Sequence, residues 1–198
     1  MVRAVSQLPE PFEVFADLFD QAMKKLPEGG NAMVVSTVDE RGRPAARVCL
    51  LKDFDEKGFV FYTNLESRKG CELAKTPYAC LVFWWPFLEK QVRIDGRTER
   101  VTDAEADAYF ASRPRGSQVG AWASQQSREL PSREELDRRV AEFEKKYEGK
   151  PVPRPPYWSG TRVIPDQIEF WTGKPSRLHE RIVYRLDGGK WTRALLYP

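Results

Sequence analysis

Histidine and cysteine are scarce in this sequence of 198 residues, and they do not occur at the spacings of a metal site. Its one histidine, His179, excludes a metal centre built from several histidines. Its three cysteines, Cys49, Cys71 and Cys80, do not have the spacing of a metal site. Their odd number, with no signal peptide before them, favours reduced and buried thiols. The sequence therefore predicts no metal site.

Long apolar runs and an excess of one charge are also missing. No apolar run approaches the roughly 20 residues that a membrane-spanning helix needs. The 32 basic residues are nearly balanced by 29 acidic ones, which gives a formal net charge of +3. A general nucleic-acid-binding protein would show a basic excess on one face. We expect a cytoplasmic protein that binds neither membranes nor nucleic acid, although this balance permits local phosphate sites.

Hydrophobic spacing divides the chain into an N-terminal segment with one helix (1–30) and a mainly β part (31–198). Apolar residues recur at helical spacing from Phe12 to Leu26, and two glycines follow. Helices are inserted at about 102–148, where capping-box patterns occur. The expected strands are Ala32–Val38, Pro44–Lys52, Gly58–Thr63, Tyr78–Trp85, Lys90–Val101, Arg162–Trp171 and a strand beginning at Ser176. Closely spaced strands of this kind favour a small antiparallel barrel, effectively one domain.

Basic residues around two of these strands predict a phosphate site. Arg47 and Lys52 stand at the two ends of an apolar strand, and alternation points them to opposite faces. Ser67 is placed to cap a helix that begins with Arg68 and Lys69, where free N–H groups and the helix dipole favour an anion. Each feature alone is typical of a solvated surface. Together they predict that Arg47, Arg68 and Lys69 converge on one phosphate.

Three further patterns point to an interface and a second polar site. The strand Tyr78–Trp85 is apolar on both faces, which predicts burial inside the barrel and under a second subunit. Tyr109 and Arg113 are four residues apart on a predicted helix and share a face. In an extended strand, the side chains of residues 177, 179 and 181 would form one row, although an exposed sheet edge also explains such a row.

Several separated segments, from about residue 31 to residue 185, resemble one family in the same order. These segments are RVCLLK, FYTNLESRKG, KQVRIDG, YFASRPRGSQVGAWASQQS and EFWTGKPSRLHERIVYR. They resemble the pyridoxine (pyridoxamine) 5′-phosphate oxidase family, whose members are FMN enzymes with an antiparallel, Greek-key split β-barrel. Two features differ from the family pattern: a longer basic N-terminal arm is not seen, and the chain ends in WTRALLYP.

The resemblance implies a homodimer with FMN sites at the subunit interface, and Gln126 and Ser127 would reach the flavin from the other subunit. The implied FMN contacts are Arg47, Val48, Cys49, Leu50, Tyr62, Thr63, Arg68, Lys69, Gln91, Gln126, Ser127, Trp171 and Arg181. The implied substrate contacts are Lys52, Tyr109, Arg113, Ser117, Arg177, Leu178 and His179. Of these, Arg177 and His179 would lie nearest the reacting carbon.

The implied reaction is FMN-dependent oxidation of pyridoxamine or pyridoxine 5′-phosphate to pyridoxal 5′-phosphate, with dioxygen reduced to hydrogen peroxide. One alternative is a flavin oxidase of the phenazine-biosynthesis type, whose precursor carries no phosphate. Another alternative is a non-catalytic split-barrel protein that only binds flavin or pyridoxal phosphate. The predicted phosphate contacts favour oxidation of the pyridoxamine or pyridoxine phosphate over the phenazine-type reaction. Release of hydrogen peroxide would distinguish an enzyme from a protein that only binds the flavin.

Overall fold

The computed structural model describes residues 9–198, so the first eight residues of the expected N-terminal segment (1–30) lie outside the described residues. The helices are α1 (Glu10–Lys25), α2 (Arg68–Lys75), α3 (Asp103–Ser112), α4 (Arg115–Ala123) and α5 (Arg133–Lys146), with 3-10 turns η2 (Pro86–Leu88) and η3 (Pro175–Arg177). The strands are β1 (Ala32–Val38), β2 (Pro44–Leu50), β3 (Asp53–Asp55), β4 (Gly58–Asn64), β5 (Tyr78–Trp85), β6 (Lys90–Arg100), β7 (Trp158–Thr172), β8 (Glu180–Asp187) and β9 (Lys190–Leu196).

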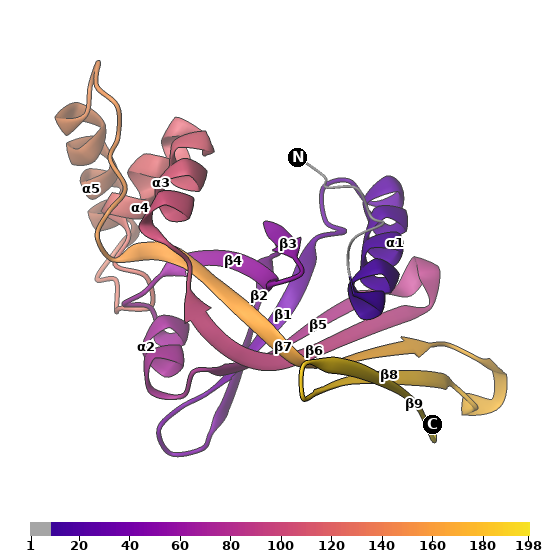
Figure 1. Ribbon diagram of the computed structural model, residues 1–198. Helices are drawn as coiled ribbons and strands as arrows, with labels where there is room; N and C mark the ends of the chain where they lie inside the picture. Colours follow the sequence, from indigo (N-terminus) through magenta and orange to yellow (C-terminus); the bar gives the residue numbers. More distant parts are fainter. Residues whose placement is uncertain (1–8) are drawn as a thin grey trace.

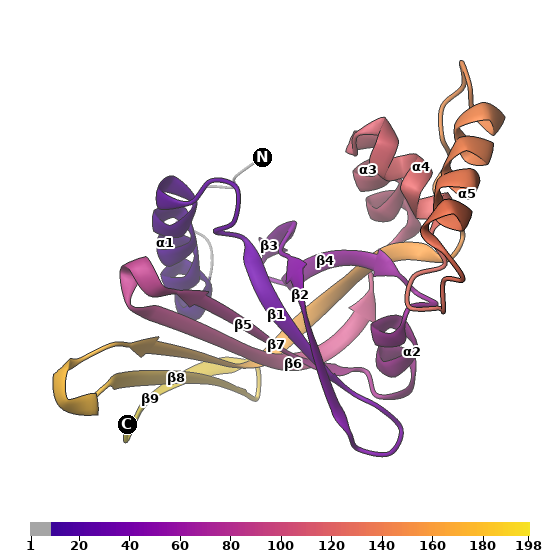
Figure 2. The ribbon, with the colours of Figure 1, turned by 180° about the vertical axis from the view of Figure 1, so that it is seen from behind.

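The strands form one antiparallel sheet that curls into a half-barrel (Figures 1 and 2). The strand order is β2-β1-β5-β6-β7-β4-β3, and β8 and β9 continue from β7. Helix α1 lies at one end of the sheet, and α3, α4 and α5 project from the other (Figure 1). The predicted fold class, mainly β with an antiparallel barrel and inserted helices, is confirmed. None of the helices in residues 9–198 is long and apolar enough to cross a membrane.

Strand β7 changes partners halfway along its length. From Thr161 onward it pairs with β6; its first part also pairs with β4 and its second part with β8. The change occurs where the β6–β7 register shifts between Asp95 and Gly96, opposite Pro165. A Cβ on Gly96 would lie 2.2 Å from the carbonyl oxygen of Ile164, so only glycine permits this close approach. The two ends of β7 therefore belong to different regions of the sheet.

Helix α1 closes the half-barrel with aromatic side chains. Phe12 and Phe15 are fully buried, as the helical spacing predicts. The Phe15 ring contacts Phe54, Phe59 and Phe83 at centroid distances of 5.0, 4.9 and 5.2 Å. Burial of such side chains contributes about 1.5–3 kcal/mol each, so α1 holds the sheet in its curved form.

Within one chain, strand β5 is buried on one face only, as the part of the prediction that concerns the barrel interior requires; burial of the other face under a second subunit stays a prediction. Ala79, Leu81 and Phe83 are buried, whereas Tyr78 and Trp84 on the other face are 43% and 53% exposed. The core of a single half-barrel lies on one side of its sheet. No described residue of this chain covers the outer face of Trp84 enough to bury it.

The strand expected from Ser176 onward begins later, so the predicted row of residues 177, 179 and 181 on one extended strand is wrong. Pro175 starts the 3-10 turn η3, because its ring fixes φ in the range that a turn requires. Ser176 and Arg177 then take left-handed φ values of 58° and 60°. Strand β8 starts only at Glu180.

Gly70 allows α2 to pack closely on the loop before it. A Cβ at this position would lie 2.2 Å from the carbonyl oxygen of Leu65. We expect Gly70→Ala to lower the free energy of unfolding by about 1–3 kcal/mol, since overpacking forces backbone shifts. The matched control is Gly116→Ala in α4, where an added Cβ meets nothing within 4 Å. Equal midpoints for the two variants in urea unfolding would contradict this prediction.

Candidate functional site

A basic pocket lies between the edge strand β2, strand β4 and the start of α2. Its volume is about 660 Å³. Among the described residues β2 pairs only with β1, so one edge of its backbone remains available to a ligand. Val48 and Leu50 are 66% and 43% exposed along this strand. The lining residues are Pro44, Ala45, Ala46, Arg47, Val48, Cys49, Leu50, Lys52, Tyr62, Thr63, Arg68, Lys69, Gln126 and Ser127.

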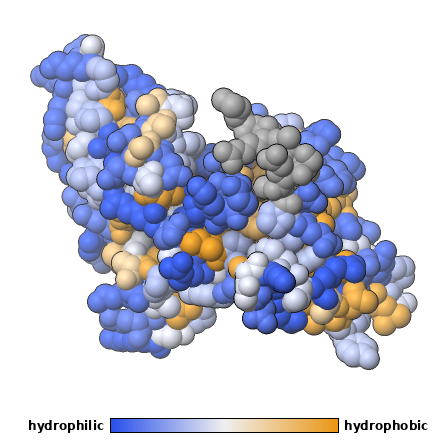
Figure 3. Space-filling model, viewed as in Figure 1, coloured by the Kyte–Doolittle hydropathy of each residue, from blue (hydrophilic) through white to orange (hydrophobic). Residues whose placement is uncertain are grey.

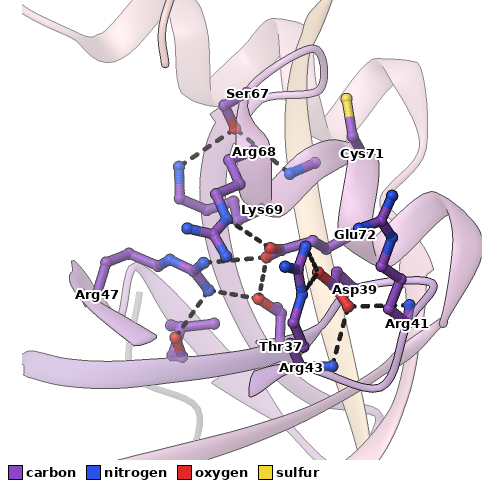
Figure 4. A network of polar contacts seen from close by, with 12 residues as sticks. Thr37, Asp39, Arg41, Arg43, Arg47, Ser67, Arg68, Lys69, Cys71 and Glu72 are labelled. Atoms are coloured by element: carbon purple, nitrogen blue, oxygen red, sulfur yellow. Dashed lines mark hydrogen bonds and ion pairs between the residues drawn. The ribbon is translucent and has the colours of Figure 1, made fainter. Parts of the chain in front are cut away.

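Three cations meet at one end of this pocket, as the sequence predicts (Figure 4). The Ser67 hydroxyl accepts a hydrogen bond from the Gly70 N–H and so caps α2. Arg68 and Lys69 form the first turn of α2, and Arg47 approaches from β2. Free backbone N–H groups of the helix start add to the three side-chain charges. This end of the pocket suits a phosphate group.

Lys69 connects this cluster to the loop after α4. Its Nζ donates to Thr63 Oγ1 at 3.0 Å, to Ser67 Oγ at 3.3 Å and to Gln126 Oε1 at 3.1 Å. Burial lowers the pKa of the Lys69 ammonium. Gln126 and Ser127 therefore line the pocket of their own chain, and the prediction that they reach it from another subunit is wrong. Ser127 takes a left-handed φ of 72° at this bend of the loop.

A second pocket, of about 360 Å³, shares a wall with the first. Lys52, Tyr62, Thr63 and Gln126 line both pockets. The predicted residues Tyr109, Arg113 and Ser117 line only the second one, together with Trp158 and others. The full lining is Lys52, Tyr62, Thr63, Asn64, Tyr109, Arg113, Ser117, Gly120, Ala121, Ser124, Gln126 and Trp158. Ser117 belongs to α4, a helix that the sequence patterns did not predict.

Stacked aromatic rings form the wall between α3 and the sheet. The rings of Tyr62 and Tyr109 stack at a centroid distance of 3.9 Å, and Tyr62 also stacks on Trp158 at 5.2 Å. Burial is the main cause that raises the pKa of Tyr62 to about 12. Tyr62 is therefore a neutral phenol at physiological pH.

The Arg113 guanidinium carries a buried donor without a partner. Its Cζ lies 4.8 Å from the Trp158 ring centroid and 5.5 Å from that of Phe110, which fixes its plane by cation–π contact. Its Nη1 is buried and makes no hydrogen bond. Burial lowers the pKa of this group. Because an unpaired buried donor is costly, its presence beside a pocket points to an anionic ligand.

The other predicted ligands form a separate group on β6, β7 and β8. Gln91 pairs with Trp171, and Trp171 pairs with Arg181, so the three lie side by side across the sheet. The His179 ring lies 4.5 Å from that of Trp171, and its Nδ1 accepts the Lys174 backbone N–H at 3.2 Å. In a neutral imidazole this bond leaves the proton on Nε2.

Arg177, Leu178 and the end of the chain surround this second group. Arg177 is exposed in η3, and Leu178 is 70% exposed. Arg181 Nε donates to Glu169 Oε1 at 2.7 Å, and its Nη1 donates to the Tyr197 carbonyl at 3.0 Å.

The two groups of predicted ligands lie far apart within the described chain. Figures 1 and 2 both show the β7–β8 turn and α2 at opposite ends of the sheet. Neither basic pocket is lined by residues from β8. Hydrophobic residues gather over the β8–β9 region at the lower right of Figure 3, where Leu195 and Tyr197 are 70% and 95% exposed. One copy of the chain therefore does not unite the predicted site.

Two residues near the basic pockets were not predicted. Glu72 lies beside the first pocket, and Trp158 lines the second. Glu72 contacts Arg47 and Arg68 directly. Its position four residues after Arg68 is the spacing of a helical ion pair, which was a usable signal. Trp158 lies 13 positions from Trp171 on one strand, and no local pattern marks it as a neighbour of Arg113.

Comparison with known proteins identifies the family. A family model described as "Pyridoxamine 5'-phosphate oxidase" matches residues 19–147, and one described as "Pyridoxine 5'-phosphate oxidase C-terminal dimerisation region" matches residues 158–198. The chain belongs to the pyridoxamine 5′-phosphate oxidase family, as the sequence motifs predict.

The similar proteins have related names. A "Pyridoxine/pyridoxamine 5'-phosphate oxidase" of Myxococcus xanthus is 61% identical over 198 residues, which cover 100% of this chain and 96% of that protein. One of Gloeothece citriformis is 53% identical and covers 96% and 89%. Among solved structures, PhzG from Burkholderia lata in complex with tetrahydrophenazine-1-carboxylic acid superposes with a TM-score of 0.90, at 30% identity, over 100% and 98% of the chains. An FMN-binding protein from Nostoc punctiforme shares the fold, with a TM-score of 0.75 at 16% identity over both whole chains.

Arg154 and Arg113 both lie beside Trp158, and comparing their substitutions tests whether the Arg113 donor is unpaired. Arg154 is fully engaged, because it donates to Asp107, Asp103 and the Trp158 carbonyl. We expect Arg154→Met to lower the free energy of unfolding by about 1–3 kcal/mol, the cost of removing hydrogen bonds to charged groups. Arg113→Met should leave the ligand-free protein equally stable or more stable, since it removes a buried N–H donor that has no partner. Urea unfolding in phosphate-free buffer measures the free energy of unfolding of both variants. Equal decreases in the two variants would show that Arg113 has a partner.

Proposed function

We propose that this protein is an FMN-dependent oxidase that converts pyridoxamine 5′-phosphate or pyridoxine 5′-phosphate to pyridoxal 5′-phosphate. The observation that carries the proposal is the pair of cation-lined pockets with a common wall. One pocket suits the phosphate of a cofactor and the other the phosphate of a substrate. The common wall of Lys52, Tyr62, Thr63 and Gln126 would keep the two ligands in contact.

The first pocket fits FMN by its donor set. Arg47, Arg68 and Lys69 would hold the phosphate, and the open backbone edge of β2 offers N–H and C=O groups along the rest of the cofactor. The other predicted contacts in this pocket lie on the two strands that flank it and in the loop after α4: Val48, Cys49, Leu50, Tyr62, Thr63, Gln126 and Ser127. When bound, FMN supplies the two-electron oxidation of the substrate and the reduction of dioxygen to hydrogen peroxide.

The second pocket fits the phosphate of the substrate. The unpaired Nη1 of Arg113 would donate to a phosphate oxygen, and Lys52, Tyr109 and Ser117 would complete the site. Binding a group remote from the reacting carbon helps to hold that carbon in place. This arrangement supports a phosphorylated substrate over an unphosphorylated one.

We infer that the second group of ligands acts in the site of a partner subunit in a homodimer. Residues 158–198 match a family model whose description names a dimerisation region, which supports this inference. So do the exposed outer face of β5 and the exposed residues near β9. Gln91, Trp171 and Arg181 would then contact the cofactor of the partner.

Arg177, Leu178 and His179 would contact the substrate from the same side. His179 would present its Nε2–H to an acceptor on the substrate, because the Lys174 N–H occupies Nδ1. The role of Arg177 and His179 is therefore to orient the substrate ring. A guanidinium and an imidazole N–H supply fixed donors for this purpose.

A phenazine-type flavin oxidase is the second candidate, supported by the likeness to PhzG bound to tetrahydrophenazine-1-carboxylic acid. That ligand carries a carboxylate and no phosphate. The cation set Lys52 and Arg113, with the Ser117 hydroxyl nearby, provides more donors than one carboxylate needs. This surplus favours the phosphorylated pyridine over the phenazine precursor.

Turnover with matched substrates tests the function. The purified protein reconstituted with FMN should release peroxide and pyridoxal 5′-phosphate in equal amounts from pyridoxamine 5′-phosphate, and should use unphosphorylated pyridoxamine poorly. Arg113→Ala should raise KM for the phosphorylated substrate at least about tenfold, because one charge-assisted hydrogen bond is lost, and should leave the flavin spectrum unchanged. Binding without peroxide release would indicate a carrier. Equal use of both substrates would contradict a phosphate site at Arg113.

Mixed dimers test the shared site. Arg68→Ala and Arg181→Ala homodimers should each have weak FMN binding and low activity. A one-to-one mixture, unfolded and refolded together, should regain about a quarter of the wild-type sites, since each heterodimer contains one site with both arginines. The control mixture combines Arg68→Ala with Arg47→Ala, two changes in the same half, and should regain nothing. Absence of recovery in the first mixture would show that the site is not shared between subunits.

A further inference from the structure

Glu72 is a buried carboxylate in the middle of the phosphate-binding cations. Its side chain is 6% exposed on α2, facing β1 and β2. Arg68 Nε donates to its Oε1 at 2.8 Å, and Arg47 Nη2 donates to its Oε2 at 3.1 Å. One acid therefore joins the two arginines that line the pocket from different elements (Figure 4).

Thr37 on β1 completes the network. Its hydroxyl accepts from Arg47 Nη1 at 2.6 Å and donates to Glu72 Oε2. Arg47 Nη1 also donates to the Val35 carbonyl at 3.0 Å. Burial would by itself raise the pKa of Glu72, but the hydrogen bonds from Thr37, Arg68 and Arg47 outweigh it and lower that pKa. Glu72 is thus ionised at neutral pH.

A negative charge beside a phosphate site has two opposite effects. By charge alone it repels the phosphate and lowers affinity. By hydrogen bonding it fixes two guanidinium groups whose long side chains otherwise lose rotamer entropy when they bind a ligand. These contacts use three of the five N–H groups of Arg47 and one of those of Arg68, so both arginines keep donors for a ligand.

We propose that Glu72 is a positioning residue of the FMN phosphate site, which holds Arg47 and Arg68 in the orientation that binds the phosphate. This inference rests on the proposed function. A glutamine at this position keeps the shape of the side chain, but its amide NH₂ faces a guanidinium donor in place of an acceptor. One of the two arginines is then released. Glu72→Gln therefore weakens FMN binding, although it makes the pocket more positive.

The experiment measures the dissociation constants of FMN and riboflavin by flavin fluorescence in the full-length wild type and Glu72→Gln. We expect FMN to bind at least about tenfold more weakly to the variant, the effect of one lost charge-assisted hydrogen bond. Riboflavin has no phosphate, so its affinity should not change. A general loss of structure would weaken both ligands equally and would overturn the proposal, as would equal or tighter FMN binding.

Glu66→Gln is the matched control for charge. Glu66 is exposed in the loop before α2 and does not line the pocket. This variant removes the same charge near the same helix start without releasing an arginine, and FMN affinity should stay the same or rise slightly. A loss equal to that of Glu72→Gln would show a charge effect and overturn the positioning role.

A second variant guards against failure to fold. Thr37→Val keeps the volume of the side chain but removes the hydroxyl between Arg47 and Glu72. It should also weaken FMN binding without changing riboflavin binding, and unchanged FMN affinity would contradict the network. The proposed function is judged separately on the wild type. A wild type that does not bind FMN overturns that function, whereas a change confined to the variants concerns Glu72 alone.

Discussion

The bend of β7 is the constraint on which the rest of the structure depends. Gly96 and Pro165 bring two strands closer than any side chain would allow, and there β7 leaves β4 and joins β8. Trp158 at one end of β7 lines the second pocket, and Trp171 at the other end lies beside His179. A 15-residue strand spans roughly 50 Å at about 3.3 Å per residue, so its two ends contribute residues to two different groups of predicted ligands. A flatter sheet would leave neither end with its present neighbours.

Buried carboxylates that each bind two arginines occur at both ends of the molecule. Glu72 joins Arg47 and Arg68 near the first pocket, and Glu169 joins Arg93 and Arg181 in the second group. Arginine side chains are long and flexible, and their orientation in solution is not fixed by the backbone. The fold therefore fixes these arginines by ion pairs to acids that are themselves held in the sheet or on a helix. Neither acid lines one of the two basic pockets, so each acts only through its arginines.

Much of the fold could be predicted from the sequence, because its signals are local. The bounds of β1 and β5 agree with the predicted ranges, and Ser67 caps α2 as expected. Helix α4 was not predicted, because Pro114 ends one helix and at once begins the next. The late start of β8 was missed because the left-handed turn at Ser176 and Arg177 contains no glycine to mark it.

Prediction of the site succeeded where neighbours in space are near in sequence and failed elsewhere. The cluster of Arg68, Lys69 and the capped helix start follows from adjacent residues. That Gln126 lies in the pocket of its own chain depends on Lys69, 57 residues away, and no periodicity carries such information. The contact of Arg113 with Trp158 likewise joins segments that only the folded sheet brings together.

The unpaired donor of Arg113 has a consequence for selectivity. This N–H is already buried without an acceptor in the ligand-free protein, so a neutral molecule in the pocket leaves that cost of about 1–3 kcal/mol unchanged. An anion of the same size that accepts the N–H removes the cost. The pocket therefore distinguishes ligands mainly by stabilising those that supply an acceptor, and this discrimination requires no contact with the rest of the ligand.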